Sequence, residues 1–139
     1  MTFFKNTLLV SDFSNLFQYD GQGKFIKKIG QKGTGPKDYV YVNSIVSDDD
    51  RNILNVFTSG KINIYDKEMN YLKSLRLLES YYGGLTTPWG SYLMYKSSFF
   101  KLVGDTSTIY SFAEIDTSAK AIRKIPNPSP IVSTYRGMI

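Results

Sequence analysis

An internal repeat is the feature of this sequence that most limits its fold. The pattern of apolar and turn residues in Leu8–Ile29 returns in Leu54–Leu75, 46 residues further along, without insertion or deletion. A third, partial copy follows at Ile115–Ile125, after a further 50 residues. The matched positions of the first two copies are Leu8 with Leu54, Val10 with Val56, Leu16 with Ile62, Tyr19 with Tyr65, Asp20 with Asp66, Phe25 with Tyr71 and Ile29 with Leu75. A chain that repeats at this interval is built from copies of one supersecondary unit.

The repeated unit consists of short alternating apolar runs separated by Gly, Asp, Asn and Ser, which is the pattern of β-strands and turns. The main runs are Leu8–Val10, Leu16–Tyr19, Phe25–Ile29, Val42–Ser47, Ile53–Phe57, Ile62–Tyr65, Tyr71–Leu77, Tyr92–Tyr95, Thr108–Ile115 and Ala121–Ile125. A period of about 46 residues is the size of one propeller blade. The sequence therefore predicts an all-β fold, a partial β-propeller of about three four-stranded antiparallel blades.

The repeat also predicts where the blades begin and end. We expect blade 1 at about 1–30, lacking its innermost strand, blade 2 at about 39–77 and blade 3 at about 83–125. The extra residues before the third copy are assigned to a loop around Ser97–Ser107, and 126–139 to a tail that crosses toward a further blade. An arc of three blades leaves two blade faces uncovered, so we expect a homodimer that completes the ring.

The segment between the first two copies is rich in glycine. Gly30, Gly33, Gly35 and Pro36 restrict the backbone to a tight excursion, which Asp38 and Tyr39 close. In a propeller this is the point at which the chain passes from the outer strand of one blade to the inner strand of the next. The alternative is a phosphate cradle, but the Gly-Lys-Ser/Thr ending, the preceding parallel strand and the following helix are missing.

Phe25–Tyr39 resembles the hallmark "GKFIRKIGRKGQGPGEY" of the NHL-like six-bladed β-propeller family that is abundant in Bacteroidetes. Leu16–Lys24 is similar to the hairpin that precedes this hallmark, and Ile53–Leu75 to the family's next blade. Lys37-Asp38 stands where the family usually has Gly-Glu, so the acid is kept. The resemblance implies blades of the six-bladed type and, for full-length members, a periplasmic or cell-surface lipoprotein with an upstream signal. It implies no particular ligand.

Composition excludes several kinds of chemistry. The 139 residues contain no Cys and no His, so the chain by itself can form no thiolate or histidine metal site and no Ser-His-Asp or Cys-His catalytic group. No cofactor and no metal ion are predicted. The first twelve residues do not form a signal peptide, because Lys5, Asn6 and Thr7 interrupt the apolar run, and no stretch is long enough to cross a membrane.

Charged residues mostly have structural interpretations. Asp20 and Asp66 begin turns, where a short carboxylate can bond the backbone two residues on. Asp48-Asp49-Asp50 is interpreted as an acidic hairpin turn, because three consecutive carboxylates diverge and the pattern of a calcium loop is missing. The basic residues of the outer strand protect an exposed sheet edge: Lys24, Lys27, Lys28, Lys73, Arg123 and Lys124.

Aromatic side chains supply the candidate contact residues. Trp89, Tyr81, Tyr82 and Tyr92 lie close together in the sequence, and Trp and Tyr are the residues that anchor partners or stack on sugars and bases. The more ordinary interpretation is that they fill the space between blades, where large flat residues pack well. Trp89 is the preferred rim contact, because it lies in the turn-like Pro88-Trp89-Gly90.

Three functions follow from these observations. The first is a non-catalytic propeller module that binds a protein, peptide or glycan and forms part of a larger six-bladed protein. The second is a metal-dependent enzyme of the NHL/paraoxonase type that a partner chain completes. The third is binding of polyanions such as RNA, favoured by the net charge of +5 but disfavoured because the lysines lie on the predicted outer edge.

Overall fold

A computed structural model describes residues 1–79, 81–96, 100–102 and 108–133 of the chain. All regular structure in these residues is β-strand. The chain divides into two compact units, Met1–Ser80 and Tyr81–Ile139. The described residues include no helix with the length and hydropathy that a membrane crossing requires.

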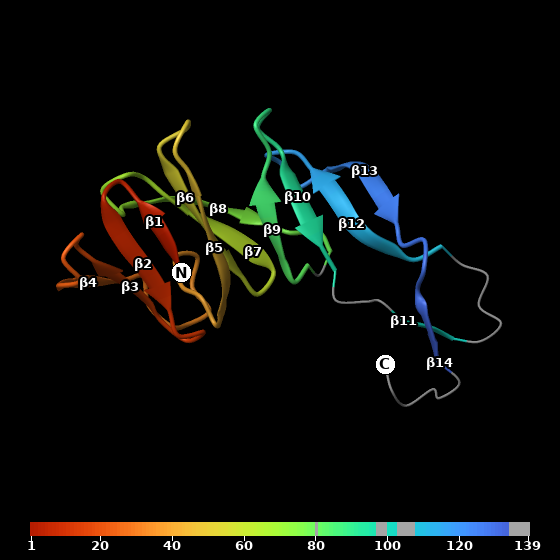
Figure 1. Ribbon diagram of the computed structural model, residues 1–139, viewed down its shortest axis with the longest axis horizontal. Helices are drawn as coiled ribbons and strands as arrows, with labels where there is room; N and C mark the ends of the chain where they lie inside the picture. Colours follow the sequence, from red (N-terminus) through yellow and green to blue (C-terminus); the bar gives the residue numbers. More distant parts are fainter. Residues whose placement is uncertain (80, 97–99, 103–107, 134–139) are drawn as a thin grey trace. The chain divides into compact units, whose positions relative to one another are not determined.

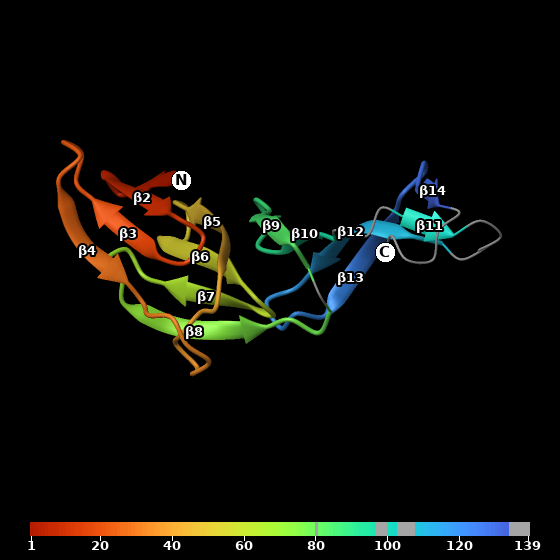
Figure 2. The same cartoon turned by 90° about the horizontal axis from the view of Figure 1, so that it is seen from below.

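The first unit contains two four-stranded antiparallel sheets (Figures 1 and 2). The strands of the first sheet follow the chain order: β1 (Thr2–Phe4), β2 (Thr7–Ser11), β3 (Leu16–Tyr19) and β4 (Phe25–Ile29). Those of the second do the same: β5 (Val42–Asp48), β6 (Ile53–Thr58), β7 (Lys61–Tyr65) and β8 (Tyr71–Arg76). Each sheet is one propeller blade with its strands in a simple meander.

The second unit contains a third blade. Its strands are β9 (Gly83–Thr86), β10 (Tyr92–Tyr95), β12 (Tyr110–Ile115) and β13 (Ala121–Pro126), paired in the order β9-β10-β12-β13. Two further short strands pair in parallel with each other: β11 (Phe100–Leu102), which lies between β10 and β12 in the sequence, and β14 (Ile131–Ser133), which follows β13. The prediction of an all-β partial propeller with three four-stranded antiparallel blades is confirmed.

Two details of the predicted blade boundaries were wrong. The first blade has its fourth strand, because β1 pairs with β2 through a turn at Lys5-Asn6. Both turn residues have positive φ, 47° and 62°, which is the type I′ geometry that joins two strands of a tight hairpin. The loop predicted around Ser97–Ser107 contains a strand, β11, which pairs with β14 in the segment assigned to the crossing tail. Ser97–Phe99, Val103–Ser107 and 134–139 lie outside the described residues.

The core of the first unit joins its two blades. Buried side chains from both sheets form one cluster: Phe4, Leu9, Leu16 and Ile29 from the first, and Tyr39, Val42, Ile45, Leu54, Val56, Tyr65 and Met69 from the second or its approach. A blade has two apolar faces and becomes stable by packing one of them on a neighbour. The predicted edge lysines lie on the last strands β4, β8 and β13 or immediately before them, with exposed side chains.

The hairpin between the last two strands has the same turn in every blade. The Oδ1 atom of Asp20 accepts hydrogen bonds from the backbone N–H groups of Gln22 and Lys24, both at 2.9 Å. Asp66 accepts from the equivalent positions at 2.9 Å each, and Asp116 at 2.8 and 3.0 Å. The hydrogen bonds of the turn hold the pKa of Asp66 below its usual value. These carboxylates are turn formers, and the repeated turn explains why the sequence repeat is so regular.

Candidate functional site

The glycine-rich segment connects β4 to β5 and runs between the two blades of the first unit. Gly30 has φ +66°, and a Cβ there would lie 2.8 Å from the ring of Tyr39. A Cβ at Gly35 would lie 2.7 Å from Asp38 Oδ2, which accepts the N–H of Gly35 at 3.0 Å. These close approaches leave room only for glycine at both positions.

Tyr39 fastens this segment to both blades. Its side chain is 1% exposed. Its hydroxyl donates to the carbonyl of Ile29 at 2.9 Å and accepts the N–H of Leu16 at 3.2 Å. Burial raises the pKa of this phenol, so it remains a neutral donor. The residues of the glycine-rich segment that the sequence singled out thus form one joint between the two blades of the first unit.

The joint does not offer a phosphate cradle. The N–H groups of Gly33, Asp38 and Tyr39 bond carbonyls within the segment at 3.0 to 3.1 Å, so they cannot point to an anion. Lys61 Nζ donates to the carbonyls of Gly35 and Pro36 at 3.0 and 2.9 Å, and burial lowers its pKa. Grooves of about 760 and 800 Å³ flank the segment, but its polar groups are used to hold it in place.

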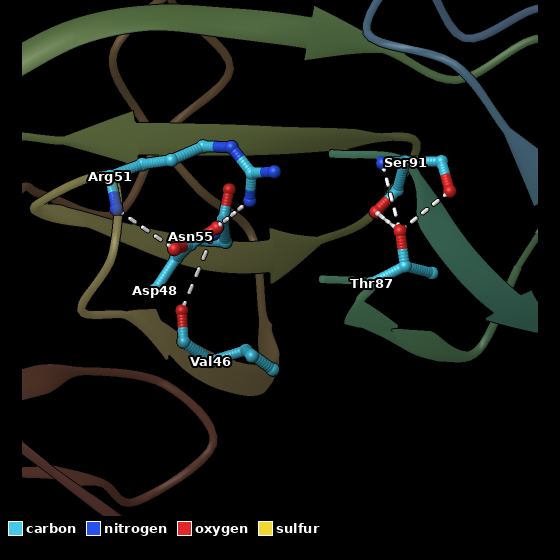
Figure 3. Close-up of polar contacts among 6 residues, drawn as sticks. All are labelled: Val46, Asp48, Arg51, Asn55, Thr87 and Ser91. Carbon is cyan, nitrogen blue, oxygen red and sulfur yellow. Dashed lines mark hydrogen bonds and ion pairs between the residues drawn. The ribbon is translucent and has the colours of Figure 1, made fainter. Parts of the chain in front are cut away.

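The acidic run Asp48–Asp50 lies at the turn between β5 and β6 (Figure 3). Asp48 is 7% exposed, accepts the N–H of Arg51 at 3.0 Å and pairs with the Arg51 guanidinium. Its carboxylate is therefore committed to closing the turn. Within 1–79, 81–96, 100–102 and 108–133, no three His, Cys, Asp or Glu side chains are grouped so that they could hold a metal ion.

Trp89 lies in the turn between β9 and β10, which hydrogen bonds close tightly. Thr87 Oγ1 accepts the N–H of Ser91 at 3.0 Å and contacts Ser91 Oγ at 2.8 Å (Figure 3). The N–H of Gly90, a residue at φ +99°, donates to the carbonyl of Thr87 at 3.1 Å. The indole of Trp89 is 68% exposed, although the turn beneath it is fixed.

Glu114, on the neighbouring part of the same blade, holds the indole in place. Its Oε1 accepts the Nε1–H of Trp89 at 2.6 Å and the hydroxyl of Ser91 at 2.5 Å. Its Oε2 accepts the Nε–H of Arg123 on β13 at 2.7 Å. The hydrogen bonds from Ser91, Trp89 and Arg123 hold the pKa of Glu114 below its usual value. We call Thr87, Trp89, Ser91, Glu114 and Arg123 the Trp89 platform.

The other predicted contact residues differ in exposure. Tyr82 is 60% exposed and its ring lies 6.0 Å from that of Tyr95, centroid to centroid. Tyr81 is partly buried, and the Nζ atom of Lys96 lies over its ring, 5.6 Å from the centroid. Tyr92 is only 4% exposed, because it lies on the inward face of β10. Tyr92 therefore belongs to the blade core, and the prediction that it contacts a ligand does not fit its position.

Sequence reasoning missed two features of the exposed aromatic surface. It gave Glu114 no role, because only the pairing of β12 with β10 and β13 brings that residue next to Trp89 and Arg123. It also passed over Phe13 and Tyr41, whose rings stack in the first unit with centroids 5.1 Å apart. These residues are far apart in the sequence, and no motif connects them.

Comparison with known proteins places the fold in context. A protein from Bacteroides fragilis described as exported matches with a TM-score of 0.76 and 24% identity, over 97% of this chain and 41% of that protein. A Bacteroides caccae protein of unknown function matches with a TM-score of 0.60 and 10% identity, over 91% and 48%. Saccharomyces cerevisiae Sqt1 matches with a TM-score of 0.54 and 11% identity, over 86% and 31%. The chain thus spans less than half of each of these structures.

These structural likenesses show the fold and no activity, and no curated protein matches the sequence. A family model described as "6-bladed beta-propeller" matches residues 1–130, which is nearly the whole length and includes all three blades. The repeat, the meander sheets and this match agree, and the chain belongs to the 6-bladed β-propeller family.

Proposed function

We propose that this chain is part of a non-catalytic β-propeller that binds a protein, peptide or glycan partner. The Trp89 platform is the observation that carries the proposal. A large aromatic ring is held in one orientation by a hydrogen bond to a buried carboxylate, yet it is 68% exposed. Such a ring can contact a partner without losing conformational freedom on binding, which is the property of an interaction hot spot.

The chemistry of the chain supports binding over catalysis. Without His or Cys, a reaction on this chain's own residues would need carboxylates, hydroxyls or lysine amines brought together in a cleft. Glu114 is the buried carboxylate of the Trp89 platform, and three donors already occupy it. It acts as an anchor for Trp89 and has no free base function in this arrangement.

The test compares three proteins on glycan and peptide arrays: the wild type, Trp89→Ala and Trp89→Phe. Removing a hot-spot ring weakens binding by more than about 2 kcal/mol, or about thirtyfold. We expect Trp89→Ala to lose this amount for at least one partner class, and Trp89→Phe to lose less because a ring remains. Wild-type levels of binding by Trp89→Ala would exclude the platform as the contact surface. Metal-dependent turnover of a lactone or phosphate ester would contradict the non-catalytic assignment.

The exposed face of the first blade supports a second proposal on assembly. Phe3, Phe25 and Ile26 are 72%, 54% and 47% exposed, and the family to which the chain belongs has six blades where this chain has three. A second copy packed on this face would bury it and supply three more blades. Light scattering of the purified 139-residue chain tests this: a dimer is expected, and a stable monomer would contradict it.

We also propose a cellular compartment for the protein. The B. fragilis protein that shares the fold is described as exported. We expect the protein that contains this chain to act outside the cytoplasm, which fractionation of the native host would test.

A further inference from the structure

Two exposed aromatic rings contact each other on the first unit, whereas the Trp89 platform belongs to the second. Phe13 belongs to the turn between β2 and β3, and Tyr41 precedes β5 of the next blade. Their rings are stacked, with centroids 5.1 Å apart and planes inclined by 29°. They are 55% and 42% exposed. We call them the Phe13–Tyr41 pair.

Phe13 occupies a backbone conformation that its residue type disfavours. Its φ is +77°, in the left-handed region where a bulky residue is an outlier. The surrounding turn holds it there: its N–H donates to Ser11 Oγ at 3.0 Å, and its carbonyl accepts the N–H of Val42 at 2.8 Å. Glycine or asparagine would meet this geometry at lower cost. Strain of this kind is concentrated at functional sites, and here its result is an exposed ring.

Phe13 also lines a groove of about 520 Å³. It is lined by Met1, Ser11, Asp12 and Phe13 of the first blade and by residues 42–45 of the second. Asp12 supplies a carboxylate: Oδ1 accepts the N–H groups of Ser14 and Asn15 at 3.0 and 2.7 Å, while Oδ2 accepts a longer bond of 3.3 Å from the Asn15 amide. The hydrogen bonds from Asn15 and Ser14 hold the pKa of Asp12 below its usual value. Oδ2 therefore keeps acceptor capacity toward a ligand.

The polar groups of this groove select among ligand classes. None of its lining side chains is Lys or Arg, so no side chain of the groove offers a counter-charge to a phosphate or an acidic peptide. A proline-rich peptide presents carbonyl acceptors and requires donors along an aromatic groove. The groove supplies an acceptor-only carboxylate at Asp12, which the carbonyls of such a peptide would leave unmatched. It also supplies the amide of Asn43 and the hydroxyl of Ser44, which can each donate and accept, and the Ser44 hydroxyl is buried without a hydrogen-bond partner. A ligand rich in hydroxyl donors matches these groups.

We propose that the Phe13–Tyr41 pair and its groove bind a neutral saccharide chain. The weakly positive C–H face of a pyranose ring would lie on the outward electron-rich face of the Phe13 ring, which stacks on Tyr41 through its other face. A hydroxyl of the sugar would donate to Asp12 Oδ2, which keeps acceptor capacity. This inference rests on the proposed function as a binding module, but it concerns residues of the first unit, whereas the Trp89 platform belongs to the second.

The experiment uses the full chain and three neutral probes, cellohexaose, mannohexaose and maltohexaose, with polygalacturonate and decaproline as comparison ligands. Binding is measured by calorimetry for the wild type, Phe13→Gly and Trp89→Ala. Phe13→Gly removes the ring and relieves the strained φ, so its melting temperature should equal or exceed that of the wild type. We expect at least one neutral hexasaccharide to bind, and Phe13→Gly to weaken it by about tenfold or more. Trp89→Ala should change this binding by less than about threefold.

Each alternative result has a defined meaning. Failure of every neutral hexasaccharide to bind, or equal binding by Phe13→Gly, overturns the inference. Phe13-dependent binding of decaproline overturns the saccharide assignment, and Phe13-dependent binding of polygalacturonate overturns the assignment to a neutral saccharide. Saccharide binding that Trp89→Ala abolishes and Phe13→Gly leaves unchanged overturns this inference while supporting the proposed function. Partner binding on the arrays without any hexasaccharide binding also overturns this inference and supports the proposed function. The two proposals can therefore fail separately.

Discussion

The Trp89 platform and the Phe13–Tyr41 pair both expose aromatic rings, but the chain holds them in different ways. Trp89 is anchored through its side chain, by the bond from Nε1 to a buried carboxylate of the same blade. Phe13 is anchored through its backbone, in a turn that keeps its φ at +77°, and by stacking on Tyr41 from the next blade. The first arrangement depends on hydrogen bonding within one sheet. The second depends on the packing of two sheets, so different substitutions should disturb each of them.

The largest effect should come from Tyr39→Ala, which acts on the second arrangement alone. Tyr39 is 1% exposed and joins the two blades that carry Phe13 and Tyr41. Truncating a buried aromatic costs about 3–5 kcal/mol. We expect the free energy of unfolding of the first unit to fall by this amount, as measured by urea titration monitored through amide hydrogen exchange. Saccharide binding should be lost with it.

A matched control and a second probe define this result. Tyr39→Phe keeps the ring and removes two hydrogen bonds, for an expected loss of about 1–3 kcal/mol. Trp89 is the single tryptophan of the chain, so its fluorescence reports on the platform alone. Native fluorescence should be unchanged in both variants. An altered Trp89 spectrum in Tyr39→Ala would show that the two arrangements are not independent.

Thr87→Ala should have the next largest effect and disturb the platform. The Thr87 side chain is 9% exposed, and its hydroxyl bonds the backbone of Ser91 at 3.0 and 3.2 Å. Losing these bonds should destabilise the turn by about 1–2 kcal/mol and shift the emission of Trp89. Thr87→Ser retains the hydroxyl and should behave as the wild type. An unchanged emission spectrum in Thr87→Ala would mean that Glu114 alone orients the indole.

Phe13 offers a smaller but more distinctive test. Phe13→Ala loses the stacked ring and keeps a Cβ at positive φ, whereas Phe13→Gly loses the ring and the strain together. We expect the glycine variant to be more stable than the alanine variant by about 1 kcal/mol, the reverse of the usual order in an element interior. Thermal unfolding of the two variants provides the measurement. Greater stability of the alanine variant would show that the turn relaxes out of the left-handed region.

Much of this architecture could be predicted from local sequence. Strand positions follow from alternation, which depends on neighbouring residues only, and the Asp20 and Asp66 turns follow from a side chain bonding its own backbone. β1 was missed because its turn uses Lys5-Asn6, without the glycine that usually signals positive φ. The Phe13–Tyr41 pair was missed because it requires both blade packing and an unusual φ at Phe13. Trp89 was found from its turn, but its anchor Glu114 depends on strand register.

The smallest expected effect is also the most specific to the platform, and it concerns the charge of Glu114. Donors from Ser91, Trp89 and Arg123 hold the pKa of this carboxyl below its usual value. A lowered folded-state pKa contributes stability that is present above the unfolded pKa of about 4.3, and that is lost as pH falls through the folded value. Trp89 emission should therefore stay constant from neutral pH to about pH 4.3 and change only below it.

Glu114→Gln keeps an acceptor for the indole but cannot ionise, so it should retain near-native emission at neutral pH and lose the acid step. A step that persists in Glu114→Gln would assign the titration to another group, and a midpoint above the usual glutamate range would show that the donors do not stabilise the carboxylate.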